Sequence, residues 1–71
     1  MKLSGSVRFR DLETGVWVFE GDDGNTYLLD GGDRKIKKDG ARIEAEGTVN
    51  RNVFTTAMVG PTFVVKSYRF I

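Results

Sequence analysis

Seventy-one residues are enough for one domain spanning 1–71, and so short a chain must close or cover its sheet because it buries only about 60% of its unfolded surface. Hydrophobic residues make up 39% and charged residues 30%, which is typical of a folded globular domain and excludes a disordered one. The net charge of +1 favours no class of partner. The absence of cysteine excludes disulfides, and the absence of histidine removes the usual general base near neutral pH.

Alternation with a period of two residues runs through the chain. From Leu3 to Arg10, apolar residues or glycine alternate with serine or arginine, which is the pattern of a half-buried strand. The predicted strands, in chain order, lie over 3–10, 16–20, 26–30, 41–49, 53–59 and 63–70. Between the third and fourth strands, Arg34–Asp39 forms a short basic connection with room for one helical turn.

Two of the long predicted strands contain a similar three-residue motif. Gly5-Ser6-Val7 in the first strand matches Gly47-Thr48-Val49 in the fourth. A glycine on the inner face lets a long strand bend sharply, as small barrels require. The sequence therefore predicts an all-β, OB-like barrel of five or six strands. The alternatives are that these glycines mark bulges, and that the fold is an SH3-like barrel.

The turn between the second and third strands sets their register. Asp22-Asp23-Gly24 fits a three-residue hairpin loop with Gly24 in the left-handed conformation. This register pairs Phe19 with Tyr27 and Trp17 with Leu29. These four side chains then share one face of the hairpin, which we expect to point into the core. The predicted aromatic core is Phe9, Trp17, Phe19, Tyr27, Phe63, Tyr68 and Phe70. In the predicted fifth strand, Phe54, Thr56 and Met58 point outward.

Three segments resemble a group of small uncharacterised bacterial and archaeal domains. These segments are the hairpin at 15–24 with its Gly-Asp-Asp-Gly turn, the Asp-Gly that leads the strand at 39–43, and Met58-Val59-Gly60. The resemblance spans nearly the whole chain and implies an OB-like fold. It implies no functional residue, and Ala57 and Val59 stand where those relatives often carry histidine and tryptophan.

The sequence favours neither a metal site nor an enzyme. A calcium site would have to use the oxygen donors Asp22, Asp23, Asn25, Asp30 and Asp33, whose spacing lacks the alternating donors and closing glutamate of a calcium loop. Glu44 and Glu46 share one strand face, about 7 Å apart by strand rise, but that face is polar and has no cleft. Ser4, Ser6 and Ser67 have no histidine to activate them. We expect no catalytic residue, no cofactor and no metal.

Charge is distributed unevenly along the chain. Residues 11–33 hold seven acidic residues and no lysine or arginine, whereas residues 34–71 hold eight basic and three acidic residues. An acidic second and third strand would repel phosphate on the face where OB-folds often bind single-stranded nucleic acid. Binding of single-stranded nucleic acid is therefore kept only as the alternative function, in which Arg34, Lys35, Lys37 and Lys38 would contact the phosphates. A solvated connection is the simpler interpretation of these four residues.

The preferred register places Val16, Val18 and Leu28 on the outer face of the hairpin. Glu20 and Asp30 frame these apolar side chains, so the face predicts a patch for a basic protein partner, which includes a second copy of this chain. The competing interpretation is that the last strand or a terminus covers the patch. We expect a non-enzymatic binding or interaction module.

Membrane and targeting signals are not evident in the sequence. No apolar run is long enough to span a bilayer, and Met1-Lys2-Leu3 leads straight into the first strand without a signal peptide, so a cytoplasmic location is the default. The chain stops at Phe70-Ile71 without a polar tail, which is also compatible with a fragment of a larger protein.

Overall fold

The computed structural model describes residues 1–11, 15–51 and 61–71. Its elements are β1 (Lys2–Arg10), β2 (Val16–Gly21), β3 (Thr26–Gly31), the 3₁₀ turn η1 (Arg34–Ile36), β4 (Arg42–Asn50) and β5 (Thr62–Phe70). The all-β class and the single helical turn are as predicted. The strand predicted over 53–59, with Phe54, Thr56 and Met58, lies outside the described residues.

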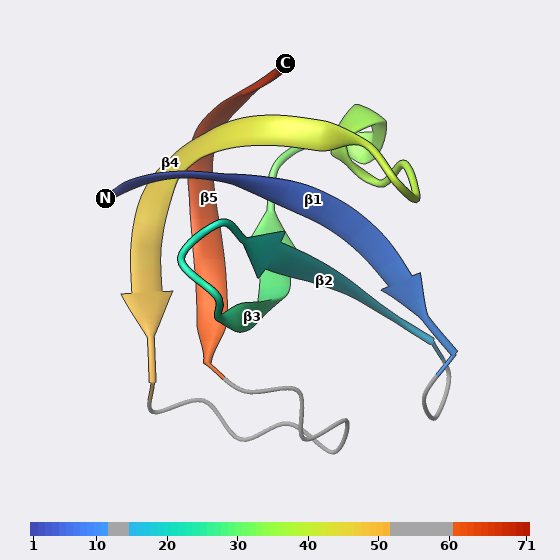
Figure 1. The fold of residues 1–71 in the computed structure, drawn as a ribbon, viewed down its shortest axis with the longest axis horizontal. Coiled ribbons are helices and arrows are strands. Elements are labelled where there is room, and N and C mark those ends of the chain that lie inside the picture. Colours follow the sequence, from blue (N-terminus) through green and yellow to red (C-terminus); the bar gives the residue numbers. More distant parts are fainter. Residues whose placement is uncertain (12–14, 52–60) are drawn as a thin grey trace.

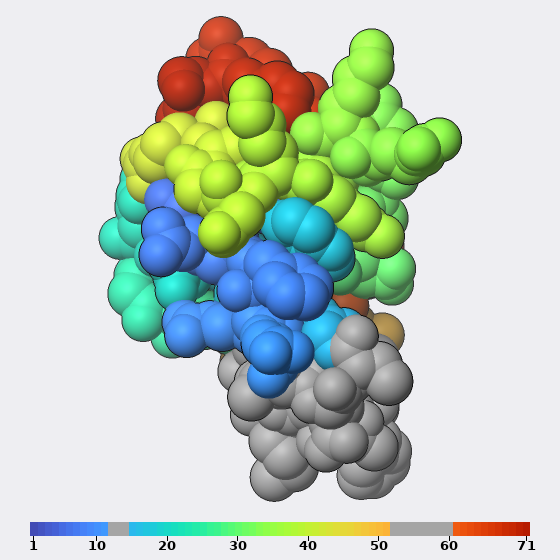
Figure 2. All heavy atoms as spheres, turned by 90° about the vertical axis from the view of Figure 1, so that its right-hand side faces the viewer, coloured from blue at the N-terminus to red at the C-terminus, as the bar shows by residue number. Residues whose placement is uncertain are grey.

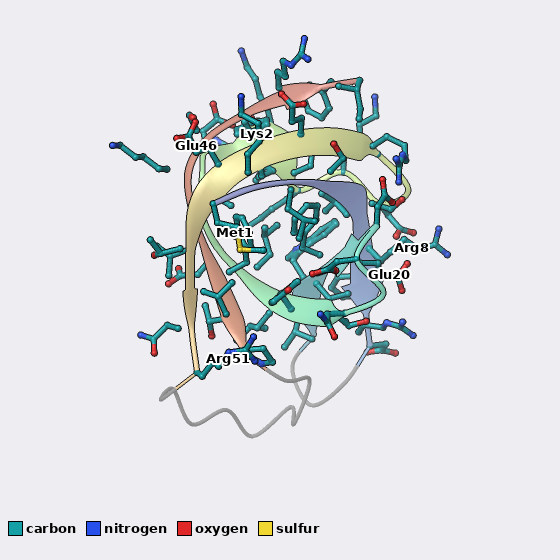
Figure 3. All side chains as sticks on the ribbon, turned by 60° about the vertical axis from the view of Figure 1, so that its left-hand side comes forward. Met1, Lys2, Arg8, Glu20, Glu46 and Arg51 are labelled. Carbon is teal, nitrogen blue, oxygen red and sulfur yellow. The ribbon has the colours of Figure 1, made fainter. Side chains whose placement is uncertain are left out.

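Hydrogen bonds join the five described strands into a closed, barrel-like ring in the order β1-β2-β3-β5-β4 (Figure 1). β3 and β5 are parallel, and every other neighbouring pair is antiparallel. The pairing of β1 with β4 closes the ring, so none of these strands is left as a free edge. Side chains fill the ring, while Arg8 and Glu46 point away from it (Figure 3).

Glycine allows β1 and β4 to run through two parts of the ring, as the sequence pattern indicated. β1 pairs with both β2 and β4, and β4 pairs with both β1 and β5. A Cβ added at Gly5 would overlap the carbonyl oxygen of Glu20, and one added at Gly47 would overlap that of Val64. The β4–β5 register also shifts between Glu46 and Gly47. These are close backbone approaches that any other residue would disturb.

The predicted hairpin register is confirmed near the turn and ends earlier than expected. Phe19 lies opposite Tyr27, the Gly21 amide donates to the Asn25 carbonyl at 2.9 Å, and Gly24 has a φ of +87°. The β2–β3 pairing stops at Val18 and Leu28, so the predicted Trp17–Leu29 pair is not part of it.

Three aromatic rings form the centre of the core. Phe63 contacts Phe19 and Tyr27 edge-to-face, with ring centroids 5.2 and 5.7 Å apart, and all three are buried. Burial of Phe9 and Phe70 was wrongly predicted, because they lie at strand ends and are 45% and 48% exposed. Each keeps one edge-to-face aromatic neighbour, Trp17 for Phe9 and Tyr68 for Phe70, and these two neighbours are half-buried.

Candidate functional site

The outer face of the β2–β3 hairpin, predicted as the partner-binding surface, is only partly exposed. Val16, Glu20 and Leu28 are half-buried and Asp30 is exposed. Val18 has 0% of its surface exposed, so the prediction that it stands out on this face is wrong.

A salt bridge joins β1 to β2 on this face. Arg10 lies opposite Val16, and its Nη2 reaches Glu20 Oε2 at 2.7 Å. Val18 lies between Val16 and Glu20 on the same strand face, so the Arg10–Glu20 pair spans its position along β2. The pair also engages the carboxylate that was predicted to attract a basic partner.

A hollow opens where β2 and β3 part beyond the Val18–Leu28 pair. Val16 continues in β2 opposite Arg10 of β1, and Leu29 continues in β3 opposite Phe63 of β5. The hollow between them has a volume of about 320 Å³. Its lining residues are Gly15, Val16, Trp17, Leu28, Leu29, Asp30, Lys37, Asn50, Thr62 and Val64. Most of the lining side chains are therefore apolar, with a few polar groups among them.

One polar group of this hollow lacks a partner. Thr62 is 3% exposed, and its Oγ1 has no hydrogen-bond partner within 1–11, 15–51 and 61–71. A buried hydroxyl without a partner costs on the order of 1–3 kcal/mol. A ligand that reached this atom would recover that cost.

The basic connection follows the C-terminal end of β3, and Figure 2 shows it standing out from the body of the domain. Arg34, Lys35, Lys37 and Lys38 are exposed, and Ile36 among them is fully buried in the core. Asp33 fixes this segment, because its carboxylate accepts hydrogen bonds from the Lys35 amide at 3.0 Å and from the Tyr68 hydroxyl.

A second hollow of about 550 Å³ lies beside this connection. Its lining residues are Leu29, Asp30, Gly31, Gly32, Asp33, Arg34, Lys35 and Lys37. Leu29, Asp30 and Lys37 line both hollows. The two hollows are therefore adjacent along β3, and we call them together the β3 groove, with an apolar end at Trp17 and a basic end at Arg34 and Lys35.

Four arginine side chains elsewhere on the surface form salt bridges with carboxylates. Arg10 pairs with Glu20 and Arg42 pairs with Asp22, the latter through two contacts of 2.8 Å. Two further pairs join Arg8 to Asp39 at 3.8 Å and Arg69 to Glu44 at 3.1 Å. In the described part of the chain, no salt bridge involves the four basic residues of the connection. Arg34, Lys35 and Lys37, which line the groove, are therefore cations without a salt bridge in the described structure, as are Lys2, Arg51 and Lys66 outside it.

Hydrogen bonds lower the pKa of three exposed carboxyl groups. The Arg42 guanidinium lowers the pKa of Asp22, the Tyr27 hydroxyl lowers that of Asp23 at 2.7 Å, and the Tyr68 hydroxyl lowers that of Asp33. The same bonds raise the pKa of both tyrosines. Each aspartate is held as an acceptor by a donor from another strand or from the hairpin itself, so all three remain ionised at neutral pH.

These shifts predict a loss of stability in acid. Because the folded pKa values of Asp22, Asp23 and Asp33 lie below the ordinary 3.8, their contribution is complete above that pH and is lost as pH falls through the lowered values. We expect the melting temperature of Asp33→Asn to fall less steeply than that of the wild type below pH 4, since the amide still accepts both hydrogen bonds but does not titrate. Thermal melts by circular dichroism between pH 7 and pH 2 measure this. The exposed Ser67→Ala variant serves as the control, and a wild-type slope in Asp33→Asn would contradict the assignment.

Comparison with protein-family models, curated proteins and solved structures found no significant match. No family is therefore identified, and the part of the sequence resemblance that stands is a small all-β domain of five strands in a closed ring. Within the described ranges, no group of three acidic side chains is placed to hold a metal ion, and no helix is long and apolar enough to cross a membrane.

Proposed function

We propose that this chain is a non-enzymatic, OB-like barrel that acts as a binding module for a protein, which occupies the β3 groove. The ring order supports the OB-like topology over the SH3-like alternative, because β1 closes onto β4 and β5 lies parallel to β3. The two long, glycine-bent strands β1 and β4 support it as well, since each takes part in both halves of the ring.

The observation that carries this proposal is the apolar hollow where β2 and β3 part. Ligand sites are typically concave and mostly apolar, with a few polar groups that orient the ligand. The hollow fits this description, because Val16, Trp17 and Val64 line it beside the Thr62 hydroxyl, which has no hydrogen-bond partner among the described residues.

The state of the carboxyl groups supports a role without catalysis. A general acid near neutral pH needs a raised pKa, and burial is the usual cause of such a shift. Asp22, Asp23 and Asp33 instead have lowered pKa values, and arginine or tyrosine donors engage each of them. Their arrangement is that of structural contacts on a surface.

Capture experiments from a nuclease-treated lysate of the source cells test the proposal. We compare wild type with Val16→Glu and Val64→Glu, which place a charge in the hollow from two different strands, and with Ser67→Glu on an exposed part of β5 as control. A buried charge without a partner is costly, so both hollow variants should reduce the recovery of a bound protein about tenfold. Ser67→Glu should leave recovery unchanged.

Folding of each variant is checked by its NMR spectrum, and two hollow variants are used so that one poorly folded protein does not decide the result. Equal recovery by folded hollow variants and wild type would show that the groove is not the binding site. A parallel capture without nuclease tests the alternative, because material recovered only from the untreated lysate would favour a single-stranded nucleic-acid binder that uses Arg34, Lys35, Lys37 and Lys38.

A further inference from the structure

We infer that the partner of the β3 groove presents an extended peptide segment with apolar side chains at one end and carboxylates at the other. This inference rests on the proposed function and adds the chemistry of the partner. The acidic sequence of the hairpin predicted a basic partner, whereas this inference gives the partner carboxylates. The difference arises because basic residues from the connection after β3 also line the groove.

Charge complementarity is the first argument. Arg34, Lys35 and Lys37 line the groove, and the salt bridges of the described residues involve other cations. Of the two acids in the lining, Asp33 already accepts hydrogen bonds from Tyr68 and the Lys35 amide, which leaves Asp30 exposed. Lys35 is attracted to the Asp33 carboxylate, so incoming carboxylates meet Arg34 and Lys37 as cations without a competing ion pair in the described structure, and the lining keeps a net positive charge of one.

The basic end is also held in position. Ile36 lies within the 3₁₀ turn, between Lys35 and Lys37, and its side chain is fully buried in the core cluster. Asp33 ties the start of the same turn to Tyr68 of β5. Since both anchors are formed before any ligand arrives, less conformational freedom is lost when a partner binds.

The shape of the groove favours an extended chain over a compact ligand. The apolar hollow and the basic hollow share Leu29, Asp30 and Lys37, so one molecule that fills both must run alongside β3. An extended peptide advances about 3.3 Å per residue with side chains on alternating sides. Such a chain can place apolar side chains beside Trp17 and carboxylates beside Arg34 in a single pass.

The lining favours a peptide over a nucleic acid. Single-stranded nucleic acids need aromatic side chains on which successive bases stack. Among the described residues, the apolar end offers one aromatic ring, Trp17, beside aliphatic side chains such as Val16 and Leu28. Asp30, exposed where the two hollows meet, would repel a phosphate backbone but can be avoided by a peptide that carries its carboxylates at one end only.

The test uses fluorescence anisotropy with synthetic probes on the full chain. One peptide carries leucine and valine followed by glutamates, in both sequence orders, a second carries lysines in place of the glutamates, and a third probe is a short oligothymidylate. Lys37→Glu changes the cation among the three residues that line both hollows, and Lys66→Glu makes the same charge change at an exposed site on β5 outside the groove.

We expect the acidic peptide to bind and the lysine peptide not to bind. Lys37→Glu should weaken binding of the acidic peptide about tenfold, while Lys66→Glu should change it less than about twofold. The inference is overturned by equal or tighter binding of the lysine peptide, by equal losses in the two variants, by no binding of the acidic peptide, or by tighter binding of oligothymidylate that Lys37→Glu removes.

Failure of this inference is distinguishable from failure of the proposed function. If lysate capture is lost in Val16→Glu but unaffected by Lys37→Glu, the groove binds a protein whose recognition does not depend on carboxylates. If neither variant affects capture, the groove itself is not the site.

Discussion

Replacing Gly47 with alanine should destabilise the domain by about 3 kcal/mol or more, the upper part of the range for overpacked sites. An added Cβ would overlap the carbonyl oxygen of Val64 and approach a ring carbon of Phe63 at 3.1 Å. The first obstacle is backbone, which cannot rotate away, so β4 and β5 would have to separate at the register shift. A domain of 71 residues has a total free energy of unfolding on the order of 4–10 kcal/mol, so this variant should be largely unfolded or close to it.

Urea unfolding followed by Trp17 fluorescence measures the effect, and Gly40→Ala is the matched control. Gly40 has a φ of +86°, but a Cβ added there meets no atom within 4 Å. Its replacement should cost only about 1 kcal/mol of left-handed backbone strain. Equal losses in the two variants would show that the close approach of β4 to β5 does not limit stability.

Replacing Phe63 with alanine should cost about 3–5 kcal/mol of stability, the typical penalty for removing a buried aromatic side chain. Phe63 is fully buried and joins Phe19 to Tyr27 through two edge-to-face contacts. Its loss would leave a cavity between two rigid rings that belong to β2 and β3. Because both rings are themselves buried, neighbouring side chains have little room to fill the space.

Phe70→Ala makes the same chemical change on the same strand at a position that is 48% exposed. Its one aromatic neighbour is Tyr68, so we expect a loss of about 1 kcal/mol or less. Urea unfolding of both variants gives the comparison. A loss in Phe70→Ala as large as that in Phe63→Ala would place the core nearer the end of β5 than the structure does.

Local patterns predicted the strands and their contacts near turns. Gly24 sets the hairpin register because a left-handed residue is needed at that point of the loop, and Phe19 consequently faces Tyr27. Gly5 and Gly47 could be identified as special positions because they interrupt the inner, apolar side of long alternating strands, and both prove to be close backbone approaches, with a register shift beside Gly47. These features depend on residues that are close in sequence or repeat with a fixed period.

Contacts between distant residues were beyond such patterns. The period of β2 places Val18 on the outer face of the hairpin, yet Val18 is fully buried in the folded domain. Arg10 reaches Glu20 from the neighbouring strand on that same face, which no local pattern predicted. Ile36 is a single apolar residue in a basic segment, without a period to mark it, and only the closed ring shows that it enters the core. The β3 groove likewise exists because β2 and β3 part after Val18 and pair with different neighbours, so Trp17 and Leu29 line a hollow.

The position of β5 in the ring has a consequence for how the domain folds. β5 is the last described strand in the chain, and it lies between β3 and β4, to both of which it is hydrogen-bonded. Neither the meander of β1 to β3 nor the pairing of β1 with β4 can complete the ring without it. Folding must therefore wait for contacts between residues far apart in the chain, which makes ring closure slow relative to formation of the β2–β3 hairpin. During synthesis, the aromatic core stays open until Phe63 emerges and enters between Phe19 and Tyr27.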